Sequence, residues 1–284
     1  MTANEALKRR TGACPYLPDP TRRPPAFLSL DDAIADFAPI ELGDLGNAAL
    51  LQRVTTKLAV PELLLAEALQ AFENDYKVLE IDGCRCHRYQ TQYFDTPNYG
   101  LYLQHHNGQR PRYKVRIRAY QDAGEAFLEV KRKSNQDIML KERLQVSDVA
   151  TGIGAEGNAF LASTFPYPAE SLHPTLWTQF QRTTLVSTQR AERVTLDMDL
   201  VLRLGRDEIT LPGIAIAEVK RSDRALRSEF VARLRALGAR PVSFSKYCFG
   251  VSLLVSRVKA NRFKPQHMLL GRMIQEGERS WMNP

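Results

Sequence analysis

The chain has 284 residues, a mass of 32.2 kDa, a formal net charge of +7 at pH 7 and a pI of about 9.3. Hydrophobic residues make up 44% and charged residues 25%, which are the values of an ordinary soluble globular protein. No stretch is long and apolar enough to cross a bilayer, and the positive charge favours an acidic partner such as nucleic acid, anionic lipid or a phosphate-rich molecule.

The N-terminal part, residues 1–45, is rich in proline, arginine and small residues, and we expect a flexible basic arm there. It lacks the apolar run of a signal peptide. The four cysteines, Cys14, Cys84, Cys86 and Cys248, show no Cys-x-x-Cys spacing, so reduced thiols and a cytoplasmic location are expected. We assign residues 46–262 to one domain and residues 263–284 to a polar C-terminal tail.

The first ordered elements are expected to be a strand, a helix, two strands and a short helix, over residues 50–58, 61–72, 76–81, 85–94 and 99–103. Arg53 and Lys57 share one face of the first strand because successive side chains point to opposite faces. Proline is tolerated at the first helical position, so Pro61 marks the start of the helix. The Asp82-Gly83 turn signal predicts that the next two strands form a hairpin.

Residues 112–146 contain the most informative pattern, three antiparallel strands over 112–120, 127–133 and 138–146. Alternation places Lys114, Arg116 and Arg118 on one face of the first strand. The same rule adds further charged side chains to that face: Glu129, Lys131, Lys133, Lys141 and Arg143. A solvated sheet face usually mixes charges, because like charges on neighbouring strands repel. A face this basic therefore indicates a polyanionic ligand.

The remaining elements are expected to be two short helices, three strands and two helices, over residues 155–164, 168–180, 184–190, 193–200, 214–220, 223–237 and 247–259. Many of the strands have one apolar and one charged face. If the sheet closes, helices need an apolar outside to pack on, so the charged faces point inward. The predicted fold is α+β, a closed antiparallel β-barrel that forms a basic tunnel with helices outside, and an open sheet with a wet charged face is the alternative.

Several short motifs occur in the order seen in one known family, and they are Arg116-Ile117-Arg118, Glu129-Val130-Lys131-Arg132-Lys133, Lys141-Glu142-Arg143, Arg193-Val194-Thr195-Leu196-Asp197, Glu218-Val219-Lys220 and Phe244-Ser245-Lys246-Tyr247. Over residues 48–255 the chain resembles the VTC domain, the polyphosphate polymerase domain of vacuolar transporter chaperone proteins. That domain belongs to the CYTH, or triphosphate tunnel metalloenzyme, superfamily. The resemblance implies transfer of the γ-phosphate of ATP to a growing polyphosphate chain, assisted by Mn²⁺ or Mg²⁺.

The resemblance also implies roles for individual residues. Catalytic phosphate ligands would be Arg116, Arg118, Lys131 and Lys246. Further substrate-binding residues would be Arg53, Lys57, Lys114, Lys133, Lys141, Arg143, Arg190, Lys220 and Ser245. Glu218 would hold the metal, and Glu129 and Asp197 are either further metal ligands or partners of structural salt bridges. One departure is Thr188, which stands for the tyrosine of a family Tyr-x-Arg pattern when Arg190 is taken as its arginine.

Three other functions are weighed against the polymerase. A hydrolase of the same fold would cleave inorganic triphosphate or a nucleoside triphosphate. A non-catalytic module would bind polyphosphate, and the missing tyrosine fits that role. The expected partners are ATP and inorganic polyphosphate or pyrophosphate. Nucleic-acid binding is not expected, because only Tyr113 and Tyr120 flank the cations as stacking positions. The sequence leaves open whether a membrane partner protein is needed.

Overall fold

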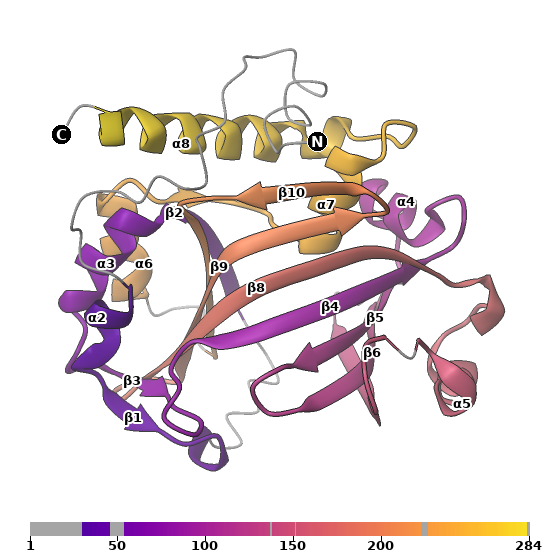
Figure 1. The fold of residues 1–284 in the computed structure, drawn as a ribbon, viewed down its shortest axis with the longest axis horizontal. Coiled ribbons are helices and arrows are strands. Elements are labelled where there is room, and N and C mark those ends of the chain that lie inside the picture. Colours follow the sequence, from indigo (N-terminus) through magenta and orange to yellow (C-terminus); the bar gives the residue numbers. More distant parts are fainter. Residues whose placement is uncertain (1–29, 46–53, 137, 151, 223–226, 283–284) are drawn as a thin grey trace.

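The computed structural model of the protein describes residues 30–45, 54–136, 138–150, 152–222 and 227–282. Twelve strands within these residues form one sheet (Figure 1), and they are β1 (Ala38–Ile40), β2 (Val54–Pro61), β3 (Tyr76–Leu79), β4 (His87–Asp95), β5 (Arg112–Tyr120), β6 (Glu125–Lys133), β7 (Met139–Val146), β8 (His173–Ser187), β9 (Glu192–Leu204), β10 (Asp207–Leu211), β11 (Ile214–Arg221) and β12 (Arg240–Pro241). No helix in these ranges is long and apolar enough to cross a membrane.

The strands follow the order β12-β2-β11-β9-β8-β4-β5-β6-β7, and every pair along this path is antiparallel. The short β1 pairs in parallel with β3, which also pairs with β8, and β10 pairs with β9. The predicted antiparallel α+β architecture is confirmed. Closure is not: among the described strands β7 pairs with β6 alone, so the two ends of the path do not join.

The sheet nevertheless curls strongly. Lys57 on β2 donates a hydrogen bond of 2.7 Å to the carbonyl of Phe244, and Lys114 on β5 donates one of 2.8 Å to the hydroxyl of the next residue, Ser245. Five steps of the strand order separate β2 from β5. Neighbouring strands lie about 4.8 Å apart, so these strands would be roughly 24 Å apart in a flat sheet. We call the face that carries Lys57 and Lys114 the inner face.

Helices cover both faces of the sheet (Figure 1), and they are α2 (Leu30–Ala35), α3 (Glu62–Gln70), α4 (Gly100–His106), α5 (Gly154–Thr164), α6 (Glu229–Ala236), α7 (Lys246–Leu254) and α8 (Lys264–Met282), with short 3-10 turns η1 (Gly43–Leu45), η2 (Ala169–Ser171) and η3 (Asn261–Phe263). A core of buried side chains joins α2, α3 and α6 to the outer face of β2, β9 and β11. A smaller core lies between α5 and β5–β6. The largest core lies on the inner face, where α7 and α8 pack.

An irregularity in β9 separates the charged part of the inner face from this apolar core. The pairing of β9 with β8 shifts register near Asp199, which has a positive φ of 49°. A one-residue slip moves the following side chains to the opposite face. Asp197 therefore lies on the inner face with the site described below, whereas Leu200 and Leu202 take over that face and join the core beneath α7 and α8.

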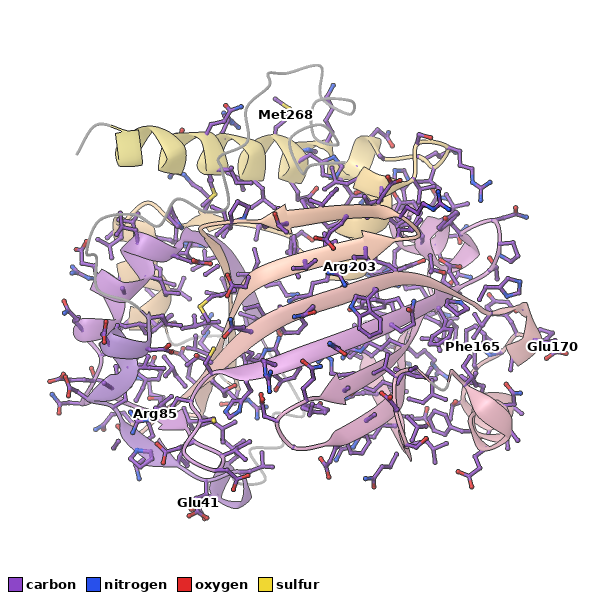
Figure 2. All side chains as sticks on the ribbon, viewed as in Figure 1. Glu41, Arg85, Phe165, Glu170, Arg203 and Met268 are labelled. Atoms are coloured by element: carbon purple, nitrogen blue, oxygen red, sulfur yellow. The ribbon has the colours of Figure 1, made fainter. Side chains whose placement is uncertain are left out.

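The two ends of the described chain differ from the expectation of an arm and a tail. In α2, Ile34 is buried against α3, and the β1 strand that follows belongs to the sheet. The C-terminal segment forms α8, whose buried Leu270, Met273 and Ile274 face the inner core, while Met268 lies on the side turned away from the sheet (Figure 2). Apolar side chains at three- and four-residue spacing explain why this segment is a helix. Residues 1–29 lie outside the described residues.

Two predictions about strands were wrong. The strands β3 and β4 flank the Asp82-Gly83 turn but do not form the predicted hairpin. A single bridge between Ile81 and Cys84 closes the turn, and β3 pairs with β1 and β8 instead. The segment 168–180 was expected to be helical, yet β8 begins at His173 after a single 3-10 turn. Its two prolines precede or begin the strand, where proline costs no ladder hydrogen bond. The thiols of Cys84, Cys86 and Cys248 are free, as expected.

Candidate anion-binding site

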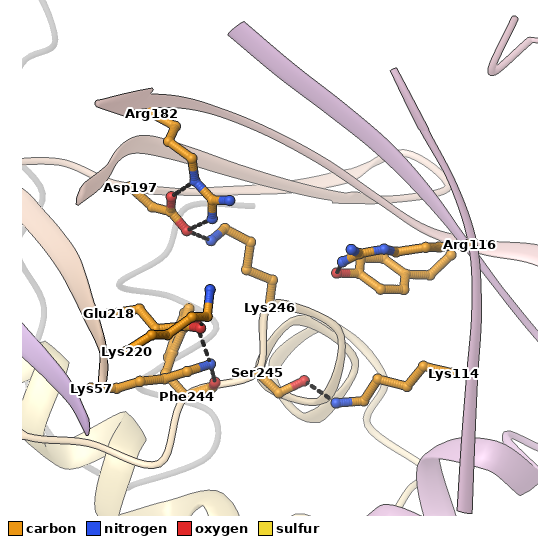
Figure 3. Close-up of polar contacts among 11 residues, drawn as sticks. Lys57, Lys114, Arg116, Arg182, Asp197, Glu218, Lys220, Phe244, Ser245 and Lys246 are labelled. Atoms are coloured by element: carbon orange, nitrogen blue, oxygen red, sulfur yellow. Dashed lines mark hydrogen bonds and ion pairs between the residues drawn. The ribbon is translucent and has the colours of Figure 1, made fainter. Parts of the chain in front are cut away.

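Charged side chains from most strands of the sheet converge on the inner face near the N-terminus of α7 (Figure 3). Lys57, Arg182, Asp197, Glu218 and Lys220 come from β2, β8, β9 and β11, and Lys114 and Arg116 reach in from the opposite wall. The carboxylates in this site are Glu129, Asp197 and Glu218. The cations outnumber them, and they are Lys57, Lys114, Arg116, Arg118, Lys131, Lys141, Arg143, Arg182, Lys220 and Lys246.

Asp197 is buried and forms ion pairs with two cations. Arg182 contacts it with two nitrogens, at 2.5 Å to Oδ1 and 2.8 Å to Oδ2, and Lys246 contacts Oδ2 as well. Burial opposes ionisation of Asp197, but these two cations hold its pKa well below the usual range. Burial lowers the pKa of Lys246 to about 8, despite the favourable contact with Asp197.

Glu218 on β11 and Asp197 on β9 are diagonal neighbours. Glu218 lies directly opposite Thr195, two residues before Asp197 on the same face. Its two oxygens take one lysine each: Lys57 Nζ lies 3.2 Å from Oε2, and Lys220 Nζ lies 2.8 Å from Oε1. Burial would raise the pKa of Glu218, but the lysines outweigh it and hold the pKa far below the usual range. The carboxylate therefore stays ionised at every pH at which an ordinary glutamate is ionised.

Glu129 occupies the opposite wall and is fully buried. Arg116 binds it from the neighbouring strand, with Nε 2.7 Å from Oε2, and Lys141 contacts Oε1 from β7. The register places Arg116 directly opposite Glu129, and Glu129 directly opposite Arg143. Burial opposes ionisation, but Arg116, Arg118 and Lys141 lower the pKa of Glu129 well below its usual range.

Two cations next to this pair have no carboxylate contact in the described part of the chain. Arg118 is 8% exposed, bonds Thr91 Oγ1 at 3.3 Å, and lies over the rings of Tyr89 and Phe180. Lys131 lies among Arg116, Arg118 and Lys141, and the charge of Arg116, then burial, lower its pKa well below the ordinary value. Like charges held this close repel one another, so the cluster is complementary to a multiply charged anion.

The N-terminus of α7 adds uncharged hydrogen-bond donors to the anion-binding site. Ser245 caps this helix, because its hydroxyl accepts a hydrogen bond from the Cys248 amide at 3.3 Å. The same hydroxyl accepts from Lys114, whose pKa burial lowers. Free backbone amides and the helix dipole at such an end favour an anion. The segment Ser245–Lys246 thus contributes a hydroxyl, an ammonium and a helix end to one site.

Three side chains of the site were not predicted from the sequence: Thr91, Tyr93 and Arg182. Tyr93 is 4% exposed and its hydroxyl accepts a hydrogen bond of 3.3 Å from Arg116. Burial alone would raise the pKa of Tyr93, but Arg116 and Arg118 lower it. Alternation along β4 placed Thr91 and Tyr93 on one face, but nothing in the sequence showed that β4 pairs with β5 beside the arginines.

Arg190 lies away from this site. It is exposed and bonds Glu229 of α6 at 2.7 Å and the Arg227 carbonyl at 3.1 Å. Thr188, two residues earlier, bonds the Asp75 carbonyl at the same edge. The inner face instead carries an aromatic-x-arginine sequence at Phe180-Gln181-Arg182. Because position 188 lies away from the site, threonine in place of tyrosine there does not change the lining of the site.

The other predicted residues lie at the rim of the site or outside the described residues. Lys141 and Arg143 are exposed on β7, where Arg143 lies over the ring of Phe127. Lys133 is partly buried at the end of β6, opposite Arg112. Arg53 lies outside the described residues.

The oxygen donors suit a hard divalent cation only in company with phosphate. Within the described residues no group of three or more His, Cys, Asp or Glu could hold a metal ion. Each of the three carboxylates is already bound by two cations. Mg²⁺ and similar ions often use one or two carboxylates together with substrate phosphates. Asp197 and Glu218, diagonal neighbours on β9 and β11, fit that arrangement once a phosphate chain occupies the lysines.

Comparison with known proteins gives one family match. The family model of the VTC domain matches residues 52–255. Among solved structures, the chain is similar to an adenylate cyclase candidate from Bacillus halodurans, at 13% identity and a TM-score of 0.46 over 68% of this chain and 93% of that one. It is also similar to an adenylyl cyclase candidate from Hippeastrum with a dominant triphosphatase activity, at 14% identity and a TM-score of 0.45 over 71% and 96%. No curated protein matches the chain.

Proposed function

The chain belongs to the VTC domain family, and from this membership we propose that it is a metal-dependent polyphosphate polymerase that transfers the γ-phosphate of ATP to the end of a growing polyphosphate chain. The observation that carries the proposal is the excess of buried and half-buried cations over carboxylates on the inner face. A chain of phosphates offers one negative charge after another, which suits a site with many cations.

Phosphoryl transfer asks the protein to position the reactants and to stabilise charge on the transferred oxygens. Arg116 and Arg118 suit the gripping of a phosphate, because a guanidinium can bind two oxygens at once. Lys131 and Lys246 approach from other elements and supply point charges around the same volume. Lys57, Lys114, Lys220 and Ser245 surround them and would hold the neighbouring phosphates.

The carboxylates keep the cations in place before the substrate arrives. Each pairs with two of them, and a phosphate that binds those cations frees carboxylate oxygens for a metal ion. Glu218, with Asp197 beside it and Glu129 on the far wall, would hold Mn²⁺ or Mg²⁺. When bound, that ion would offset negative charge on the phosphate oxygens.

Incubation of the purified protein with ATP and Mn²⁺ tests the proposal. The products are resolved on a gel stained for polyphosphate, and free phosphate is assayed in parallel. A ladder of long chains that depends on the metal is expected. Free phosphate without a ladder would replace the polymerase by a triphosphatase of the same fold. Neither product, with tight polyphosphate binding, would leave a binding module.

A further inference from the structure

Asp95 is a fully buried carboxylate at the end of β4, outside the group of charged residues described above. Its Oδ1 accepts hydrogen bonds from the amides of Thr96 at 2.7 Å and Leu101 at 2.8 Å, and its Oδ2 accepts one from the Tyr102 amide at 2.9 Å. These contacts fix the carboxylate against the N-terminus of α4. Oδ2 therefore has a second lone pair free to accept a hydrogen bond from α7.

The hydroxyl of Tyr247 donates a hydrogen bond to that second lone pair. Tyr247 is 1% exposed and lies in the first turn of α7. Tyr247 directly follows Ser245 and Lys246, the two residues by which α7 enters the site. A helix turn is rigid, so a bond that fixes Tyr247 also fixes the direction from which its two neighbours reach the inner face.

The ring of Tyr247 continues the connection to the opposite wall. It stacks on the ring of Tyr93, with centroids 5.1 Å apart and planes 29° from parallel. The Tyr93 hydroxyl in turn accepts a hydrogen bond from Arg116. One buried series of contacts thus runs from Asp95 through two tyrosines to Arg116. Figure 3 shows Lys246 reaching from α7 toward Asp197, with Arg116 on the opposite wall.

We propose that Asp95 and Tyr247 are positioning residues, which hold Lys246 of α7 and Arg116 of β5 at a fixed separation across the site. This inference rests on the proposed function, because it assumes that both cations bind one phosphate chain. Neither Asp95 nor Tyr247 touches that chain. Two cations on different elements bind a rigidly spaced anion best when their separation is set in advance. The conformational entropy of ordering them is then lost during folding and not during binding.

The Tyr247→Phe variant tests the inference with the least disturbance. It removes one hydroxyl and keeps the ring that stacks on Tyr93, while Asp95 keeps the three amides of its own segment. Tyr102→Phe is the matched control. Tyr102 is buried on α4, and its hydroxyl donates a hydrogen bond of 2.5 Å to the Lys259 carbonyl, away from the charged residues.

Three quantities are measured on both variants and on the wild-type protein: the affinity for inorganic tripolyphosphate by calorimetry, kcat and KM with ATP and Mn²⁺, and the thermal midpoint. Tyr247→Phe is expected to lower kcat by about tenfold or more and tripolyphosphate affinity by several-fold, since small misplacements are costly in phosphoryl transfer. Tyr102→Phe is expected to retain wild-type values of both, with a comparable decrease in the thermal midpoint.

Equal affinity and turnover of the two variants would overturn the inference and leave Tyr247 a structural residue. The outcome is separable from that of the proposed function. A wild-type protein that neither makes polyphosphate nor releases phosphate would end the polymerase proposal, yet the tripolyphosphate affinities of the variants would still decide whether Tyr247 positions the site.

Discussion

Lys114 donates a hydrogen bond of 2.8 Å to the hydroxyl of Ser245, and this contact joins β5 to the N-terminus of α7 across the inner face. The hydroxyl also accepts from the Cys248 amide. A serine oxygen has two lone pairs and one proton, so both acceptor positions are used and the proton remains to be donated. Ser245 is therefore suited to donate to a bound phosphate.

The first prediction concerns that serine. Ser245→Ala should lose about 1 kcal/mol of unfolding free energy, as other helix caps do, and should also weaken tripolyphosphate binding. Ser228→Ala is the control, because Ser228 caps α6 in the same way by accepting from the Val231 amide. We expect similar losses of stability by urea denaturation and a loss of affinity in Ser245→Ala alone. Equal affinities would show that the hydroxyl serves the helix and not the ligand.

A second prediction separates the two arginines of β5. Arg116 and Glu129 form a buried pair with side chains 7% and 0% exposed, so Arg116→Gln should cost about 3 to 5 kcal/mol of unfolding free energy. Arg118 bonds a threonine and lies over two aromatic rings, among like charges. Arg118→Gln should leave stability within about 1 kcal/mol of wild type and weaken tripolyphosphate binding about tenfold. Tight binding by a stable Arg118→Gln protein would remove Arg118 from the site.

The third prediction concerns the carboxylate proposed for the metal. Glu218→Gln frees Lys57 and Lys220 from their ion pairs, so tripolyphosphate binding without metal should be kept or strengthened. Turnover that depends on Mn²⁺ should be lost, because the neutral amide is a much weaker ligand. Glu208→Gln removes an exposed carboxylate that pairs with Arg203 and serves as the control. Wild-type metal dependence in Glu218→Gln would place the ion elsewhere.

A fourth prediction follows from the pKa of Lys246, which burial lowers to about 8. The ammonium is present below that pH and is lost above it, so the affinity for tripolyphosphate should decline as the pH rises through about 8. Arginine stays charged throughout this range. Affinity measured by calorimetry from pH 6.5 to 9.5 should therefore show a decline in the wild-type protein that Lys246→Arg lacks. Identical profiles would assign the decline to another group.

The fifth prediction concerns Glu62, at the start of α3. Burial, with a contribution from the charge of Asp199, raises its pKa to about 7, from an ordinary value of 4.5. A carboxyl group whose pKa is raised by folding binds its proton more tightly in the native state, so stability falls as the pH rises from about 4.5 to about 7. Glu62→Gln should remove a cost of about 3 kcal/mol at pH 8 and little at pH 4.5. A gain of equal size at both pH values would refute this assignment.

The meander of β5–β7 could be predicted from the sequence because its three strands are consecutive and joined by turns. Alternation alone then identifies the face of Arg116, Arg118 and Lys131. The opposite wall could not be derived in the same way. Its ion pairs join segments far apart in the chain, such as Arg182 with Asp197 and Asp197 with Lys246. Alternation gives the face of a side chain, but the pairing of distant strands determines its neighbours.

Arg182 is absent from the predicted site because the prolines of the segment 168–180 favour short helices over a strand there. The alternation of Phe180, Arg182 and Thr184 with Gln181 and Thr183 was the signal for a strand. The C-terminal helix was missed although Leu270, Met273 and Ile274 have helical spacing, because the segment is otherwise polar.

The register shift at Asp199 gives the site a direction. Had alternation continued along β9, Asp199, Val201 and Arg203 would face inward. Instead the inner face changes within a few residues from carboxylates and cations to Leu200 and Leu202, which are fully buried beneath the helices. Under the proposed function, a phosphate chain lying among the cations would therefore meet buried hydrocarbon on the side of Leu200 and Leu202. Such a chain would lengthen away from that apolar side, so one extra residue in β9 would set the direction of its growth.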